Sequence, residues 1–347
     1  MSEAEPKRLV VFGVTGHLGQ QLVEKISEGD WPIGELIGVA SAGSAGAEFE
    51  FRGEFLDVVS EWPVLKGRDL VFICTPPAEA LEIVREALRA EVPCVDCTGA
   101  LGNQPDVPMP SPTDLSAASA DGDHLDEWSK APLLEIPSGT SLAWAPVLEA
   151  LSVSRVVGTV LCSASALGQN GVSALSGESI ALFNQADEPE LGPAAQAVAF
   201  DVIPGSGIDC ERVRSDLSRL LGRELRLDLA SVLVPTFVGE GASLALELSD
   251  PANRETVEAR LEATEGITIV RDGLGSRGLV AVEGDLAAPI GPSLRDTIGS
   301  DEILIGRVEP DSSLPVGVGW RLWLAFDPLR LTADHALRLA RRRLGLA

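Results

Sequence analysis

L-V-V-F-G-V-T-G-H-L-G, residues 9–19, is the stretch that decides the fold of this 347-residue chain. It opens with Leu9–Gly13, a short apolar run that ends in glycine, and a helical pattern of apolar residues follows. Glycines at every third position, Gly13, Gly16 and Gly19, let the backbone turn sharply and let a pyrophosphate approach the main chain. The start of a helix presents free N–H groups and a positive dipole end to such an anion. The pattern predicts a dinucleotide-binding turn; the alternative is a tight turn whose glycines serve packing alone.

Predicted strands and helices alternate after this turn. We expect strands over Glu35–Ala40, Leu70–Cys74 and Pro93–Asp96, with a strongly periodic helix over Ala78–Ala90. Alternation of this kind predicts a parallel sheet built from βαβ units. Continuous apolar strands such as L-V-F-I-C suit a sheet that is covered on both faces. The first part of the chain therefore predicts an α/β fold with a Rossmann-like parallel-sheet domain.

The chain changes character at Asn103–Lys130, a stretch rich in proline, serine, alanine and aspartate that we interpret as a surface loop. A short strand over Leu133–Ile136 and a helix that starts near Thr140 are expected to follow it. The strands after that point suit a mixed sheet, so an α+β domain is expected there. Further expected elements are strands over Val156–Ser165, Leu227–Phe237, Ser243–Leu248 and Glu302–Glu309, and helices over Asp209–Leu221 and Thr332–Leu344.

Composition limits the classes of partner. The formal net charge is −25 and the sequence pI is about 4.4, so the molecule repels phosphate backbones and anionic lipid. We therefore expect no nucleic-acid partner and no membrane partner; no apolar run is long enough to span a bilayer, and the polar start of the chain is unlike a secretory signal. Five cysteines, an odd number in a long chain, argue against a disulfide framework. These features predict a reduced, cytoplasmic protein.

Several segments follow, in order and spacing, the motifs of a known enzyme family. They read V-D-C-T-G-A-L at 95–101, E-I-P-S-G-T-S at 135–141, D-V-I-P at 201–204 and V-L-V-P-T-F-V-G-E-G-A-S-L-A-L-E at 232–247. Along nearly its whole length the chain resembles the aspartate-semialdehyde dehydrogenase family. The resemblance implies a Rossmann-like NAD(P)-binding domain over residues 1–135, to which residues 328–347 return, and a dimerisation domain over residues 136–327. It also implies a homodimer.

The functional positions of that family carry residues of different chemistry in this chain. Gly139 stands in the place of the cysteine that attacks the aldehyde carbonyl, and Glu240 in the place of the acid/base histidine. Leu233 replaces the arginine that clamps the substrate carboxylate. The remaining replacements are Gly102 for an arginine that holds phosphate or substrate, Gly43 and Ala47 for an arginine and a lysine that would face the extra phosphate of NADP, Ser165 for a glutamine, and Pro328 for an asparagine.

We therefore predict no catalytic residue and a catalytically degenerate relative of the dehydrogenases, which acts as a regulatory or scaffold homodimer or pairs with an active relative. The alternative is an active NAD(P)-dependent semialdehyde dehydrogenase that uses another catalytic group. Hydroxyls at Ser138, Thr140 and Ser141 need a positioned base, and Glu240 would serve only if burial raised its pKa toward neutrality. Thr140 or Ser141 is instead expected to cap the helix that follows.

The candidate ligand is NAD or NADP. The absence of the two cations at positions 43 and 47 disfavours NADP, and weakened or lost binding of both cofactors is a further alternative. The predicted cofactor-binding residues are Gly13, Thr15, Gly16, His17, Leu18, Gly19, Ser41 and Ser44. No metal site is predicted. The cysteines of C-V-D-C at 94–97 are expected in the core, and His17, His124 and His335 are too scattered to form a site.

Overall fold

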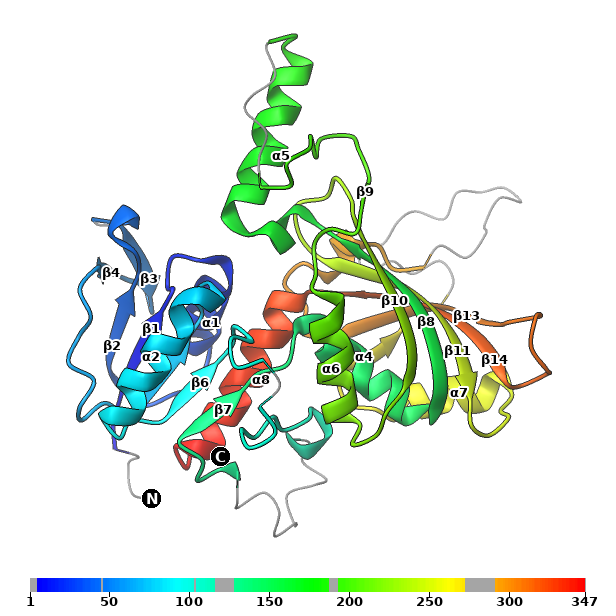
Figure 1. Ribbon diagram of the computed structural model, residues 1–347, viewed down its shortest axis with the longest axis horizontal. Helices are drawn as coiled ribbons and strands as arrows, with labels where there is room; N and C mark the ends of the chain where they lie inside the picture. The colour runs from blue at the N-terminus through cyan, green and yellow to red at the C-terminus, as the bar shows by residue number, and fades with distance from the viewer. Residues whose placement is uncertain are drawn as a thin grey trace. The chain divides into compact units, whose positions relative to one another are not determined.

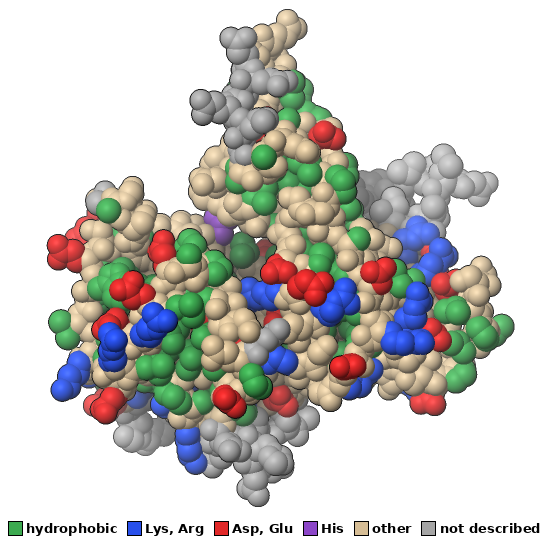
Figure 2. Space-filling model, in the orientation of Figure 1, with side chains coloured by type: hydrophobic (Ala, Val, Ile, Leu, Met, Phe, Trp, Pro, Cys, Tyr) green, Lys and Arg blue, Asp and Glu red, His purple; other side chains and the backbone are tan. Residues whose placement is uncertain are grey.

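The structure is a computed structural model that describes residues 5–44, 46–102, 104–115, 128–186, 193–271 and 291–346 (Figure 1). It divides into two compact units: Met1–Leu142 with Leu329–Ala347, and Ala143–Pro328. On the face drawn in Figure 2, the basic and acidic side chains of the described residues are intermixed.

The first unit is built on a seven-stranded sheet with the order β3-β4-β2-β1-β5-β6-β7. β1 lies at its centre and pairs in parallel with β2 on one side and with β5 on the other, and β6 and β7 extend the parallel run. The prediction of a Rossmann-like parallel sheet is thus confirmed. The strands of the parallel run are β1 (Lys7–Phe12), β2 (Ile33–Val39), β5 (Leu70–Ile73), β6 (Cys94–Asp96) and β7 (Leu133–Glu135).

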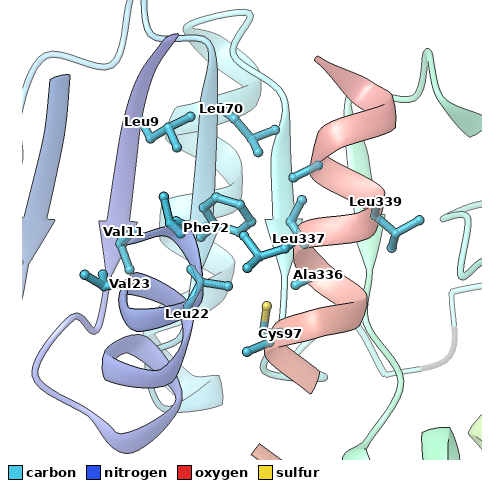
Figure 3. Close-up of a cluster of buried hydrophobic side chains, with 14 of the residues drawn as sticks. Leu9, Val11, Leu22, Val23, Leu70, Phe72, Cys97, Ala336, Leu337 and Leu339 are labelled. Carbon is cyan, nitrogen blue, oxygen red and sulfur yellow. The ribbon is translucent and has the colours of Figure 1, made fainter. Parts of the chain in front are cut away.

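Both faces of this sheet are covered, which explains its apolar strands. On one face α1 (His17–Glu28) and the terminal helix α8 (Pro328–Arg343) share a core with β1 and β5. Figure 3 shows Leu22 of α1 and Leu337 of α8 reaching toward Phe72 of β5. The other face packs on α2 (Pro77–Arg89).

A hairpin of β3 (Glu48–Phe51) and β4 (Glu54–Val59) was not predicted. Its strands are short and carry glutamates on their exposed faces, so their hydrophobic signal is weak. β4 nevertheless pairs in parallel with β2 and extends the sheet beyond it. The hairpin therefore adds a wall beside the carboxyl end of β2, and the chain that leaves β4 passes close to the glycine turn.

The second unit holds a mixed seven-stranded sheet with the order β12-β13-β14-β11-β8-β10-β9, as expected for an α+β domain. The long buried strand β8 pairs in parallel with β10 and antiparallel with β11. The strands of this second sheet are β8 (Val153–Cys162), β9 (Ile203–Pro204), β10 (Arg226–Leu233), β11 (Glu240–Leu248), β12 (Ile267–Ile269), β13 (Ile303–Pro310) and β14 (Gly319–Phe326). The helices beyond the sheet are α4 (Gly139–Ala150), α5 (Gly168–Phe183), α6 (Cys210–Leu220) and α7 (Arg254–Glu262).

Several element ends differ from the sequence-based expectation. β8 ends at Cys162. A short 3-10 turn over Ala164–Leu167 follows it, so Ser165 lies outside the strand. β10 stops at Leu233, two residues before Pro235, which has no N–H for a sheet ladder. The terminal helix starts at Pro328 because proline is well suited to the first turn of a helix. Within the expected loop 103–130, Thr113–Leu115 form a 3-10 turn, and 116–127 lie outside the described residues.

Candidate functional site

The glycine turn after β1 is held by close backbone packing. Gly13 has φ +82°, and its N–H donates to the Val39 carbonyl at 2.8 Å. A Cβ on Gly13 would lie 2.4 Å from the Cys74 carbonyl oxygen, and one on Gly19 would lie 2.2 Å from the Gly13 carbonyl oxygen. Both distances are far below van der Waals contact. Gly13 and Gly19 are therefore required for packing, whatever the turn binds.

Gly16 differs from its two neighbours in the motif. A Cβ there would meet only the Gly13 carbonyl oxygen, at 3.3 Å, so packing does not demand glycine. Gly16 is the N-cap of the twelve-residue helix α1 and makes no side-chain capping bond. The N–H groups at the start of α1 thus have no capping side chain from Gly16, which leaves them for an anion.

A cavity of about 300 Å³ opens at this turn. It lies at the carboxyl ends of the neighbouring strands β2, β1 and β5, where open parallel sheets bind their ligands. Ten of its fourteen lining residues were not predicted from the sequence, among them Ser60 and Trp62 on the chain that leaves β4, and Thr75 and Glu79 near the start of α2. The complete lining is Phe12, Gly13, Thr15, Gly16, Val39, Ala40, Ser41, Ser60, Trp62, Cys74, Thr75, Pro76, Glu79 and Ile83.

The eight predicted cofactor-binding residues fall into two groups. Four of them, Gly13, Thr15, Gly16 and Ser41, line the cavity. The others lie behind or beside it: Ser44 Oγ is 3.3 Å from Thr15 Oγ1, Leu18 packs against the core, Gly19 is buried in α1, and the His17 Nδ1 atom is buried without a hydrogen-bond partner. The cavity is therefore formed by the turn, by the end of β2, by the chain that leaves β4 and by the segment that runs from the end of β5 into α2.

The segment 137–141 forms the start of α4. Gly139 is the first helical residue and is partly exposed. Ser138 caps the helix, since its Oγ accepts a hydrogen bond from the Ser141 N–H at 3.3 Å. The prediction that Thr140 or Ser141 is the cap is therefore wrong, because both lie inside the first turn and are buried. Ser138 Oγ and Ser141 Oγ are 2.7 Å apart and hydrogen-bond to each other.

Two further positions singled out by sequence lie in the second unit. Leu233 ends β10, is 1% exposed and pairs with Cys162 of β8 and Ile203 of β9. Glu240 begins β11, is 3% exposed and pairs with Cys162 and with Phe326 of β14.

Cys94, Cys162 and His335 are buried and do not supply a replacement nucleophile or base. Burial, followed by the charge of Asp96, raises the pKa of Cys94 to about 12, and burial beside Glu240 raises the pKa of Cys162 as well. Both thiols therefore stay protonated. Burial lowers the pKa of His335 to about 4, so this imidazole is neutral. Its Nε2–H donates a hydrogen bond to the Pro110 carbonyl oxygen at 2.9 Å. His124 lies outside the described residues.

No cluster of three or more histidine, cysteine, aspartate or glutamate side chains suited to a metal ion occurs among the described residues. Within the same residues, no helix is long and apolar enough to cross a membrane.

Comparison with known families follows the division into two units. Residues 8–115 match the NAD binding domain of semialdehyde dehydrogenase, and residues 144–331 match its dimerisation domain. The chain belongs to the semialdehyde dehydrogenase family. The resemblance inferred from the motifs is thus confirmed, and the first unit has the fold of a nucleotide-binding domain.

Similar proteins span the same length. The USG-1 protein homolog of Pseudomonas aeruginosa is 28% identical over an alignment 343 positions long, which covers 94% of each chain. Aspartate-semialdehyde dehydrogenase 2 of Vibrio cholerae is 25% identical over an alignment 348 positions long, which covers 96% of each chain. The structure of a probable aspartate-semialdehyde dehydrogenase from Pseudomonas aeruginosa superimposes with a TM-score of 0.78 at 27% identity, covering 97% of this chain and 98% of that one. The two-domain architecture is therefore that of the family.

Proposed function

We propose that this protein is a catalytically degenerate member of its family, a homodimer that binds a dinucleotide or a small anion and has a regulatory or scaffold role. The observation that carries the proposal is Gly139, which begins α4 at the place where the resembling enzymes have their attacking cysteine. A glycine has no side chain that can form a bond to an aldehyde carbon. Semialdehyde oxidation in the family begins with that bond.

The neighbouring hydroxyls are poorly placed to take over. Ser138 and Ser141 hydrogen-bond to each other and close the first turn of α4, and Thr140 is only 2% exposed. A hydroxyl becomes a nucleophile only beside a positioned base. These side chains therefore support the role of helix cap better than the role of nucleophile.

The glycine turn supports retained ligand binding. The cavity opens at the start of α1, where Gly16 supplies no capping side chain, so the residues present fit a dinucleotide. A bound nicotinamide would supply a hydride acceptor, but this chain provides no group at 139 to prepare a substrate for it. Binding without turnover is the function that these residues support best.

A turnover assay tests the proposal most directly. The full chain is incubated with aspartate semialdehyde, phosphate and either NAD or NADP, and nicotinamide absorbance is followed. Robust turnover with either cofactor would contradict the degenerate function and would favour an active dehydrogenase with another catalytic group.

The homodimer is supported by an apolar surface on the second unit as well as by the matched dimerisation domain. Hydrophobic side chains gather over α5, as Figure 2 shows. Phe183 at the end of α5 is 77% exposed and meets the ring of Phe200, itself 68% exposed, edge to face at 5.7 Å. Ile180, Leu182 and Val202 are exposed in the same segments. Exposed apolar patches of this kind mark interaction surfaces.

Replacing Phe183 with aspartate is expected to weaken self-association at least about tenfold, because a charge would have to be desolvated in an apolar contact. Light scattering coupled to gel filtration, over a range of concentrations, measures the effect. Leu81→Asp is the matched control, since Leu81 is an exposed leucine on α2, in the other unit. Equal dimer fractions in wild type and F183D would contradict the use of this surface.

A further inference from the structure

The cavity at the glycine turn lies at the topological switch point of the sheet. The chain leaves β1 for β2 on one side and later crosses to β5 on the other, so a crevice opens between the two connections. In this class of fold, the end of the second strand faces the adenosine ribose of a dinucleotide. Here that place is held by Ala40 and Ser41, and both line the cavity.

The groups around this place suit a neutral ribose and oppose a phosphate. Ser41 and Ser60 offer hydroxyls to the cavity, and neither lysine nor arginine is among the residues that line it. Glu79 lines it as an acidic side chain. A 2′-phosphate carries close to two negative charges and needs cationic or N–H partners. With a carboxylate and neither lysine nor arginine in the lining, the cost of desolvating that phosphate would not be offset.

An adjoining cavity of about 600 Å³, between α1 and the β3–β4 hairpin, shares Thr15 and strengthens this charge pattern. Its arginine, Arg52, already donates to the carbonyl oxygens of Gly29, at 3.3 Å, and Trp31, at 2.7 Å. The Arg52 guanidinium is therefore already hydrogen-bonded to backbone carbonyl oxygens of the same unit. The acidic residues that line the same space are Glu24, Glu28, Glu48 and Glu50.

Trp62 adds an aromatic surface to the cavity. Its indole is 44% exposed and is fixed edge to face against Phe12 of β1, with 5.3 Å between ring centres. An anchored, half-exposed indole is suited to stacking with a nucleobase, an interaction worth about 1–3 kcal/mol per base. The cavity thus joins hydroxyls for a ribose with a flat apolar surface for a base.

We propose that this cavity selects NAD(H) over NADP(H), with Ser41 and Ser60 facing the unphosphorylated ribose, Glu79 opposing a 2′-phosphate and Trp62 stacking on the base. The proposal rests on the dinucleotide binding proposed above and adds the choice between the two cofactors. It assigns specificity to Ser60, Trp62 and Glu79, which lie outside the glycine motif.

Titration of the full chain with NADH and with NADPH, by calorimetry and by energy transfer from tryptophan to nicotinamide, tests the proposal. NADPH is expected to bind at least about tenfold more weakly than NADH. Trp62→Ala should weaken NADH binding about tenfold, the loss of one stacking contact. Equal or tighter binding of NADPH would overturn the selectivity while leaving dinucleotide binding intact. Binding of neither cofactor would overturn the dinucleotide function itself, and the selectivity with it.

Gly43→Arg provides the reciprocal test. A Cβ on Gly43 meets only Ser41 Oγ, at 3.6 Å, so a longer side chain fits without displacing the turn. The guanidinium should raise NADPH affinity about tenfold or more and leave NADH affinity nearly unchanged. Gly43→Gln, with similar reach but no charge, is the control. An equal gain for both cofactors in G43R, or an equal gain in G43Q, would overturn the role of charge in the selectivity.

Discussion

Replacing Gly139 with cysteine is expected to create a reactive thiol without creating a dehydrogenase. Gly139 is the first residue of α4 and is partly exposed, so a cysteine there would have helical backbone and access to solvent. A thiol in the first turn of a helix has its pKa lowered by the helix dipole and the free N–H groups, which increases its reactivity. Alkylation by iodoacetamide should therefore be clearly faster in G139C than in Ala150→Cys, which places the same thiol at the opposite end of α4.

Turnover by G139C should nevertheless remain at the wild-type background. In another enzyme class, loss of the nucleophile lowers the rate about 10⁶-fold, equivalent to roughly 8 kcal/mol of activation free energy. A thiol restores only the attack. The resembling enzymes also use a histidine and an arginine in the same step, and those places hold Glu240 and Leu233, both buried on strands of the second unit. A covalent adduct could form, but neither substrate orientation nor proton transfer would be supplied.

Two measurements on G139C separate the outcomes. Mass spectrometry after incubation with aspartate semialdehyde reports adduct formation, and nicotinamide absorbance reports turnover. Rapid alkylation together with background turnover is the expected result. It would mean that the start of α4 still activates a thiol, while the other groups needed for aldehyde oxidation are absent. Restoration of turnover by this single substitution would show that an acid/base group is still present, and the degenerate function would have to be abandoned.

Sequence patterns predicted the parts of the fold whose signals are local and strong. The apolar runs of β1 and β5 and the periodic α2 lie within a few residues of the expected places. The β3–β4 hairpin was missed because its glutamate-rich strands gain their apolar environment only by packing beside β2. α5 was missed because much of its apolar surface faces outward, so its hydrophobic residues do not follow one face.

The site was predictable to the same extent. The glycine turn was predicted from the order of strand, turn and helix, and Ser41 from its place after the second strand, in a segment that resembles the family's. Trp62 and Glu79 did not, because their place beside the turn depends on an unpredicted strand and on the start of a neighbouring helix. The capping serine was misplaced by two or three residues because Ser138, Thr140 and Ser141 are all capping residue types. The structure distinguishes them because α4 begins at Gly139, which makes Ser138 the residue that precedes the helix.

Gly13→Ala is expected to destabilise the first unit by about 3 kcal/mol. Left-handed backbone at a residue with a Cβ costs roughly 1–2 kcal/mol, and forcing a methyl group into a filled space costs about 1–3 kcal/mol more. Both apply here, since Gly13 has φ +82° and its Cβ would stand 2.4 Å from the Cys74 carbonyl oxygen. Native-state hydrogen exchange at the amides of β1 and β5 measures the loss locally.

Gly16→Ala separates packing from ligand binding within the same motif. Its Cβ would approach only the Gly13 carbonyl oxygen, at 3.3 Å, and the backbone of Gly16 is extended, so stability should fall by about 1 kcal/mol or less. The added methyl group would stand beside the cavity at the start of α1, where it should weaken NADH binding about tenfold or more. A stable G16A that binds NADH as well as wild type would mean that the motif now serves packing alone. A G16A as unstable as G13A would contradict the division of roles among the three glycines.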